Sequence, residues 1–253
     1  MSKFTIAVLN QKGGVGKTTT AINLAAYLAK AGRSILVVDL DPQGNSTSGL
    51  GLDKQALSST LYDVLFSRSQ AVDTIAKISR NLSLLPANAD LAGAEVEMVN
   101  LPQRELLLRG ALSQLEYDYV LIDCPPSLGL LTVNGLASAG SVLIPVQAEY
   151  YALEGLSQLL NVIQQVRSAL NPSLDILGVL ITLYDSRNSL SAQVRKELED
   201  YFGAKLFKTL VPRNVRLAEA PSFGRTIADH DKWSKGARAY KALAKEVERR
   251  TLG

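Results

Sequence analysis

The sequence predicts an α/β fold in which helices cover both faces of a twisted, mainly parallel sheet. Short apolar runs recur along the chain, and amphipathic stretches separate them. The runs show little apolar–polar alternation, which is typical of strands that are buried on both faces. The predicted strands are residues 4–10, 34–40, 82–86, 117–124, 141–146, 174–182 and 205–212.

Helices are expected between these strands. The clearest are residues 18–32 and 189–203, where apolar side chains recur every three or four positions, and a last helix over 235–253. The chain of 253 residues contains no repeat, low-complexity tract or linker. A chain of this length can bury a core without disulfide or metal support, so we expect a single domain over residues 1–253.

The composition excludes several kinds of site. Cys124 is the one cysteine and His230 the one histidine, which rules out an intrachain disulfide, a four-cysteine metal site and a site built on several histidines. Cys124 itself is expected to be a packed side chain. The N-terminus lacks the pattern of a signal peptide, and no apolar run is long enough for a membrane span. We therefore expect a cytoplasmic protein.

Charge is distributed unevenly along the chain. The net charge is +3, but the segment from Arg187 to the end holds 15 Lys and Arg residues against 8 Asp and Glu residues. A basic C-terminal quarter on an acidic body indicates a polyanionic partner, or else a solvated basic surface.

A glycine-rich loop follows the first predicted strand and precedes the first predicted helix. It departs from the pattern G-x-x-x-x-G-K-[ST] because Gln11 replaces the first glycine and Lys12, an additional lysine, follows it. Glycines allow backbone N–H groups to approach phosphate oxygens, and the helix directs its positive end at the same place. Lys17 can reach the outer phosphates and Thr18 can offer its hydroxyl to Mg²⁺. The predicted nucleotide-binding residues here are Gly13, Gly14, Val15, Gly16, Lys17, Thr18 and Thr19.

Carboxylates end two further strands. Asp123 follows four apolar residues, as expected of a side chain that holds Mg²⁺. Asp39 and Asp41 lie two apart after the second strand, so they share one side of an extended segment. One can orient toward the metal and the other toward an attacking water. The glycine- and serine-rich residues that follow, 42–51, are expected to form a mobile loop.

Taken together, KGGVGKTTT, DLDPQGN, IDCPPS and VPRNVRLAEAPS resemble the motifs of the deviant Walker A ATPases, and specifically of the ParA/Soj partitioning ATPases. The resemblance runs from about residue 6 to residue 248. It implies a P-loop NTPase fold and a slow Mg²⁺-dependent ATPase that acts on ATP. It also implies an ATP-dependent homodimer, in which Lys12 reaches the nucleotide of the partner subunit.

The resemblance also assigns roles to single residues. It implies that Lys12, Lys17 and Asp41 are catalytic, with Asp41 positioning the hydrolytic water. Thr18 and Asp123 correspond to the Mg²⁺ site, to which Asp39 is added as a candidate. Asn214 and the backbone near Pro212 correspond to the adenine pocket. Glu149 corresponds to a residue near the partner's nucleotide, although the surrounding QAEYY departs from related proteins.

The basic residues and the resemblance together point to DNA. Arg187 and Arg216 resemble positions that Soj-type proteins use for nonspecific DNA, and no base-reading signature is present. The last helix offers little apolar surface for insertion into lipid, so no membrane partner is expected. The further candidates are Lys235, Arg238, Lys241 and Lys245, for which a solvated helix face is the alternative.

The implied function is DNA segregation. A ParB/Spo0J-like DNA-binding protein would stimulate hydrolysis, and the protein would associate with the nucleoid. The single cysteine argues against a nitrogenase iron protein, whose dimer is bridged by cysteines. No N-terminal helix-turn-helix is expected, because the sequence begins directly at the first strand. Two alternatives remain at this point, a membrane-associated MinD-like positioning ATPase and a positioning ATPase for another cytoplasmic cargo.

Overall fold

The predicted α/β fold is confirmed. The computed structural model describes residues 2–149 and 154–253, and in this part of the chain seven strands form one sheet of order β3-β4-β2-β5-β1-β6-β7. All neighbouring strands are parallel except β3 and β4. The strands are β1 (Phe4–Val8), β2 (Ile35–Asp39), β3 (Ala76–Ser79), β4 (Leu82–Leu85), β5 (Tyr119–Asp123), β6 (Ser141–Gln147) and β7 (Asp175–Thr182). The last two residues of QAEYY lie outside the described residues.

The strand predicted over residues 205–212 is wrong. Leu206 and Pro212 make only isolated bridges, to Val179 and Tyr184. The backbone N–H groups between them, at Lys208 and Thr209, donate instead to the buried carboxylate of Glu246. Phe207 and Val211 still donate to Val179 and Ile181 of β7, but a side chain from a distant helix takes the donors between them and interrupts the pairing.

The edge strand β3 was missed. Its residues alternate between half-buried and exposed positions, so it lacks the continuous apolar run by which the central strands are recognised. Its antiparallel pairing with β4 makes it the exception to the parallel sheet.

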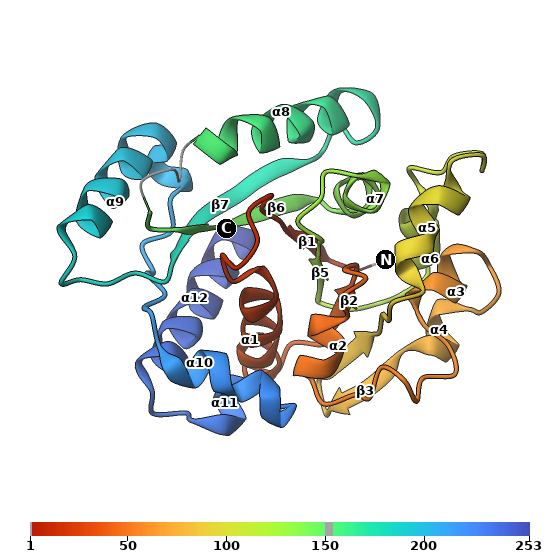
Figure 1. Ribbon diagram of the computed structural model, residues 1–253, viewed down its shortest axis with the longest axis horizontal. Coiled ribbons are helices and arrows are strands. Elements are labelled where there is room, and N and C mark those ends of the chain that lie inside the picture. The colour runs from red at the N-terminus through yellow and green to blue at the C-terminus, as the bar shows by residue number, and fades with distance from the viewer. Residues whose placement is uncertain (1, 150–153) are drawn as a thin grey trace.

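Helices cover both faces of the sheet (Figure 1), and every strand except β3 contributes side chains to two separate cores. On β1, Ile6 and Val8 pack toward α1 and α12, whereas Ala7 points into the core beneath α7 and α8. The helices are α1 (Lys17–Lys30), α2 (Asn45–Gly49), α3 (Leu61–Leu65), α4 (Ala71–Thr74), α5 (Leu91–Met98), α6 (Leu107–Leu112), α7 (Leu130–Ser138), α8 (Glu154–Ala169), α9 (Ser189–Phe202), α10 (Val215–Glu219), α11 (Ile227–His230) and α12 (Lys235–Leu252), with 3-10 turns η1 (Gly203–Lys205) and η2 (Ala220–Phe223).

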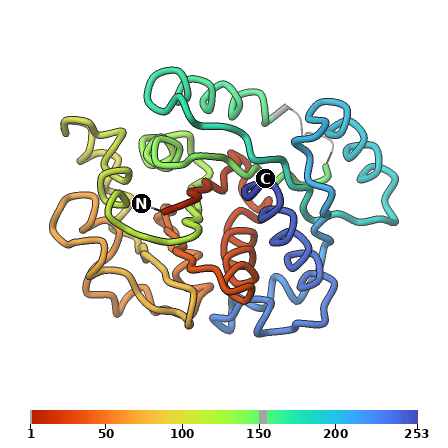
Figure 2. Tube along the Cα trace, turned by 180° about the vertical axis from the view of Figure 1, so that it is seen from behind, coloured from red at the N-terminus to blue at the C-terminus, as the bar shows by residue number. Residues whose placement is uncertain are grey.

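The first and last helices lie side by side, although they come from opposite ends of the chain (Figure 2). Their contact is apolar except for a hydrogen bond of 3.1 Å between the buried hydroxyls of Thr20 and Tyr240. Residues that follow β1 are thereby tied directly to α12. Among the described residues, no helix combines the length and apolar character that crossing a bilayer requires.

Candidate functional site

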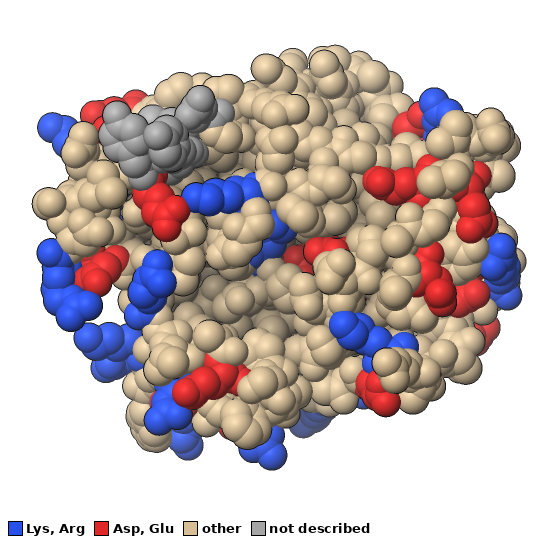
Figure 3. Space-filling view, in the orientation of Figure 1, with Lys and Arg blue, Asp and Glu red and all other residues tan. Residues whose placement is uncertain are grey.

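Strand order brings three of the predicted loops together. Because β5 lies between β1 and β2, the carboxyl ends of these strands meet at one edge of the sheet. Asp123 at the end of β5 is in register with Asp39 on β2 and with Val8 on β1. Open α/β sheets bind ligands at this edge. The face of the molecule drawn in Figure 3 is hollowed near its centre, in front of α1.

Hydrogen bonds fix the conformation of the glycine-rich loop. Asn10 donates to the carbonyl of Pro145 at 2.6 Å and accepts the N–H of Lys12 at 2.9 Å. The hydroxyl of Thr182 donates to the carbonyl of Val15 at 2.8 Å. These bonds come from β6 and β7 and from Asn10, the second residue after β1, so the sheet itself sets the shape of the loop.

The glycines are required by this shape. Gly14 and Gly16 have φ values of +74° and +87°, which side chains rarely tolerate. Their N–H groups and that of Gly13 have no hydrogen-bond acceptor among the residues that the structure describes. A Cβ at Gly13 or Gly14 would meet no atom within 4 Å. Free backbone donors beside open space at the start of α1 suit an anion.

Lys17 is the buried cation of this site. Its ammonium donates to the carbonyl of Lys12 at 3.1 Å. Burial lowers the pKa of Lys17, while the negative charges of Asp123 and Asp41 oppose this change. An anion bound to the loop would add a compensating charge to a cation that has lost most of its water.

Asp123 has one oxygen without a partner. Its Oδ2 accepts the hydroxyl of Ser46 at 2.8 Å, whereas its buried Oδ1 has no hydrogen bond in the described part of the chain. Burial, with the charge of Asp41, raises the pKa of Asp123 to about 6, against the opposing effect of the Thr18 and Ser46 hydroxyls. A buried carboxylate oxygen with no donor fits a cation.

Asp39 is held by the chain more completely. Its Oδ2 accepts both the N–H and the hydroxyl of Thr47 at 2.7 Å, and its Oδ1 accepts the N–H of Asp41 at 3.4 Å. Burial and the charge of Asp123 raise the pKa of Asp39 to about 8. Asp39 therefore lies beside Asp123, the candidate metal ligand, but its oxygens mainly accept hydrogen bonds that position the segment after β2.

That segment differs from its prediction. The prediction of a loop over residues 42–51 is wrong, because Asn45–Gly49 forms the helix α2. Ser46 and Thr47 are fully buried, and the Thr47 hydroxyl also accepts the N–H of Ala87 at 2.9 Å. Sequence reasoning missed both residues. A hydroxyl pair placed soon after two strand-ending aspartates was the available signal.

Asp41 and Lys12 lie nearer the surface. The Oδ1 of Asp41 accepts the N–H of Gln43 at 2.9 Å, which fixes the carboxylate on its turn. The ammonium of Lys12 pairs with Glu149 at 2.8 Å, and Gln147 also donates to that carboxylate. Lys12 and Glu149 are both about half exposed, so the structure places Lys12 on its own subunit's Glu149 and at the rim of the site.

The predicted adenine residues supply a second polar atom without a partner. Asn214 precedes α10, and its Oδ1 is buried with no hydrogen bond among the described residues. Pro212 is half-buried and bridges to Tyr184 next to β7. A buried amide oxygen without a donor fits a ligand that presents an N–H group, as adenine does. Cys124 is fully buried, and burial raises its thiol pKa, in keeping with a packed residue.

The predicted DNA residues fall into two groups. The guanidinium of Arg187 donates to both carboxylate oxygens of Asp185, and Arg216 forms an ion pair with Glu219 at 2.9 Å. On α12, Arg250 pairs with Glu246, whereas four other basic side chains are exposed and have no ion-pair partner among the described residues. These free cations are Lys235, Arg238, Lys241 and Lys245. Basic side chains gather at the left and along the lower edge of Figure 3, in the region of α9 to α12.

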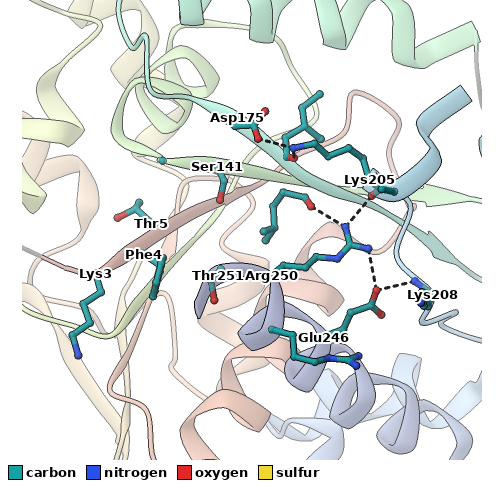
Figure 4. A pocket seen from close by; sticks show the side chains of 15 residues that line it. Lys3, Phe4, Thr5, Ser141, Asp175, Lys205, Lys208, Glu246, Arg250 and Thr251 are labelled. Atoms are coloured by element: carbon teal, nitrogen blue, oxygen red, sulfur yellow. Dashed lines mark hydrogen bonds and ion pairs between the residues drawn. The ribbon is translucent and has the colours of Figure 1, made fainter. Parts of the chain in front are cut away.

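The far end of α12 is fastened by a charged network (Figure 4). Arg250 donates to the carbonyls of Leu177, Lys205 and Leu206 and to Glu246, and its guanidinium lies 4.0 Å from the ring centroid of Phe207. Since the three bonds to backbone carbonyls reach β7 and the segment after α9, the C-terminal end of α12 is held against the body of the protein.

Comparison with known proteins identifies the family. The AAA domain family matches residues 3–176. The sporulation initiation inhibitor protein Soj of Bacillus subtilis is 54% identical over 245 residues, which cover 96% of this chain and 97% of Soj. The chain belongs to the Soj/ParA family of chromosome-partitioning ATPases. The chromosome partitioning protein ParA of Myxococcus xanthus is likewise 54% identical, over 97% of this chain and 88% of that protein.

Solved structures agree with this place in the Soj/ParA family. Cobyrinic acid a,c-diamide synthase from Mycobacterium smegmatis, with bound ADP and magnesium, is 39% identical with a TM-score of 0.89 over 100% of this chain and 96% of that one. The septum site-determining protein MinD from Pyrococcus horikoshii, complexed with Mg-ADP, is 26% identical with a TM-score of 0.81 over 98% and 97% of the two chains.

Proposed function

We propose that this Soj/ParA-family chain is a Mg²⁺-dependent ATPase that switches DNA binding on and off during segregation of chromosome or plasmid origins. The free cations of α12, on a helix tied to the nucleotide loop, carry the proposal. The tie is the buried bond from Tyr240 to Thr20, three residues after Lys17. Nucleotide bound at the loop is therefore one helix away from the basic surface.

ATP and Mg²⁺ fit the described residues. The free N–H groups of Gly13, Gly14 and Gly16 suit phosphate oxygens, and the unpartnered Oδ1 of Asp123 suits a cation. Val15 lies in the same loop and Thr19 in the first turn of α1. Asn214 and Pro212 form the part of the site that binds adenine. Bound Mg²⁺ would neutralise phosphate charge between Thr18 and Asp123, with Asp39 behind them.

The chain's own groups supply the remaining chemistry. Lys17 stabilises negative charge on the outer phosphates, and its burial makes that interaction stronger than it would be in water. Asp41 orients the water that attacks the terminal phosphate, giving ADP and inorganic phosphate. Lys12 leaves Glu149 and reaches the partner's nucleotide, so that dimerisation depends on ATP. A ParB/Spo0J-like partner stimulates turnover and returns the protein to monomers, which detach from the nucleoid.

Burial favours DNA over a membrane as the surface that α12 meets. The apolar side of α12, including Ala237, Tyr240 and Val247, is packed against the protein and is unavailable to lipid. Its opposite side carries the free cations.

The test measures how much random-sequence duplex DNA the protein binds, with ATP or with ADP, over a series of salt concentrations. ATP-dependent binding that weakens with salt is expected, with the logarithmic slope falling by about one for each cation removed. Lys241→Ala should show that change, whereas Lys77→Ala on β3 is the matched control at an exposed lysine far from α12. Retention by anionic vesicles in place of DNA would move the protein to the membrane-associated alternative. Binding to neither, with dimerisation intact, would favour protein cargo.

A further inference from the structure

Trp233, the one tryptophan of the chain, is exposed at the start of α12. Its side chain is 78% exposed, the largest fraction among the exposed large apolar residues described. Burying an indole normally contributes strongly to folding, and exposed tryptophan is characteristic of binding surfaces. Nothing in the fold requires the ring at this position.

The turn that presents Trp233 is well fastened. The N–H of Trp233 donates to Asp231 at 3.1 Å, and the hydroxyl of Ser234 donates to the Asp231 carbonyl at 2.9 Å. The same hydroxyl accepts the N–H of Ala237 at 3.1 Å and caps α12. The backbone beneath the ring is thus held by both α12 and the preceding turn, which lowers the entropic cost of binding through this side chain.

One cation lies over the ring, and others follow it in the sequence. The ammonium of Lys232 lies 5.2 Å from its centroid. Lys235 and Arg238 follow on α12 without ion pairs among the described residues. Arg216 lies 3.8 Å from the same Asp231 carboxylate that accepts the N–H of Trp233. Arg216 pairs with both nearby carboxylates, Asp231 and Glu219. Lys232, Lys235 and Arg238 have no ion-pair partner among the described residues, so the charge near Trp233 is mainly positive.

We infer that Trp233 is an aromatic DNA contact, packing its indole against the sugar and base edges of a groove while the neighbouring cations bind phosphates. This inference rests on the proposed function and adds to it an apolar component of binding. An acidic protein surface would also match the cations. Duplex DNA, however, presents regular phosphates beside the apolar edge of a groove, which matches an exposed ring with Lys232 over it and further cations after it.

An apolar contact and a phosphate contact respond differently to salt. Each lost phosphate contact lowers the logarithmic salt slope by about one, because fewer counterions are released. Loss of an aromatic contact weakens binding equally at every salt concentration. We expect Trp233→Ala to weaken ATP-dependent duplex binding by about tenfold with an unchanged slope, a loss typical of an aromatic contact. Trp233→Phe should recover part of the affinity.

Lys235→Ala and Val96→Ala are the matched controls. The first should change the slope, and the second removes an exposed apolar side chain on α5, away from α12, and should leave DNA binding unchanged. Thermal unfolding of each variant checks that the fold is retained. Because Trp233 is the one tryptophan, fluorescence excited at wavelengths that tyrosine does not absorb reports on this position alone: duplex DNA added to the ATP-bound protein should quench it and protect it from acrylamide.

Several results would overturn the inference. Unchanged affinity in Trp233→Ala, with wild-type binding intact, removes the aromatic contact and leaves the proposed function standing. Protection from acrylamide by ATP alone assigns the ring to the interface between subunits, and protection only by an acidic protein assigns it to a protein partner. Failure of the wild-type protein to bind DNA overturns both proposals.

Discussion

Replacing Asp123 with asparagine should stabilise the nucleotide-free protein and remove its stabilisation by Mg-ATP. The pKa of Asp123 rises from its ordinary value of 3.8 to about 6 because the carboxyl is buried, beside Asp41. Each pKa unit corresponds to about 1.4 kcal/mol, so ionising this carboxylate costs about 3 kcal/mol of folding free energy at pH 8. The amide keeps an acceptor for the Ser46 hydroxyl and carries no charge.

The sign of the pH dependence follows from the raised pKa values. Between about pH 4 and pH 8 the folded protein binds more protons at Asp123 and Asp39 than the unfolded chain does, since the pKa values rise to about 6 and about 8. The stability of the nucleotide-free wild type therefore falls as pH rises through this window. In Asp123→Asn the decline should be smaller, with a gain of about 2–3 kcal/mol at pH 8 and almost none at pH 4.

Urea unfolding at pH 4, 6 and 8, with and without Mg-ATP, measures both effects. Mg-ATP at a hundred times its dissociation constant should stabilise the wild type by about 2.7 kcal/mol and the variant far less. Asp118→Asn is the matched control on the residue before the same strand. Hydrogen bonds from Ser34 and Lys3 lower the pKa of Asp118, so this change should destabilise the protein at pH 8 and preserve the response to Mg-ATP. Equal or lower stability of Asp123→Asn at pH 8, or an undiminished Mg-ATP response, would refute the reasoning.

Three further substitutions test other parts of the site. Lys17→Ala should abolish ATP binding measured by calorimetry, while Lys30→Ala at the other end of α1 should preserve it; binding retained by Lys17→Ala would contradict the phosphate site. Asp41→Ala should accumulate as an ATP-bound dimer in size-exclusion chromatography because hydrolysis is lost, and a monomer with ATP would remove the assigned role. Tyr240→Phe leaves the buried Thr20 hydroxyl without its partner and should cost about 1–2 kcal/mol of stability in urea; no change would show that this bond does not hold α12.

Much of the fold followed from local pattern. Central strands such as 117–124 carry continuous apolar runs, and the glycine-rich pattern before α1 is typical of a phosphate-binding loop followed by a helix. The errors occurred where a distant side chain decided the structure. Residues 205–212 have a strand-like composition, but Glu246 takes the N–H groups of Lys208 and Thr209 and interrupts the pairing with β7. Residues 42–51 have a loop-like composition, but Asp39 accepts two hydrogen bonds from Thr47 and holds α2 in place within them.

The sequence by itself determined the alternation of strands and helices, the phosphate loop and the family, because each depends on residue types at short spacing. Only the tertiary structure decided which polar groups meet. Ser46 reaches Asp123 across 77 residues, Lys12 reaches Glu149 across 137, and Thr20 reaches Tyr240 across 220. The unpartnered oxygens of Asp123 and Asn214 are likewise visible only in the fold. Hydrogen bonding and burial depend on the packing of the whole chain, and packing places these groups together irrespective of their distance in the sequence.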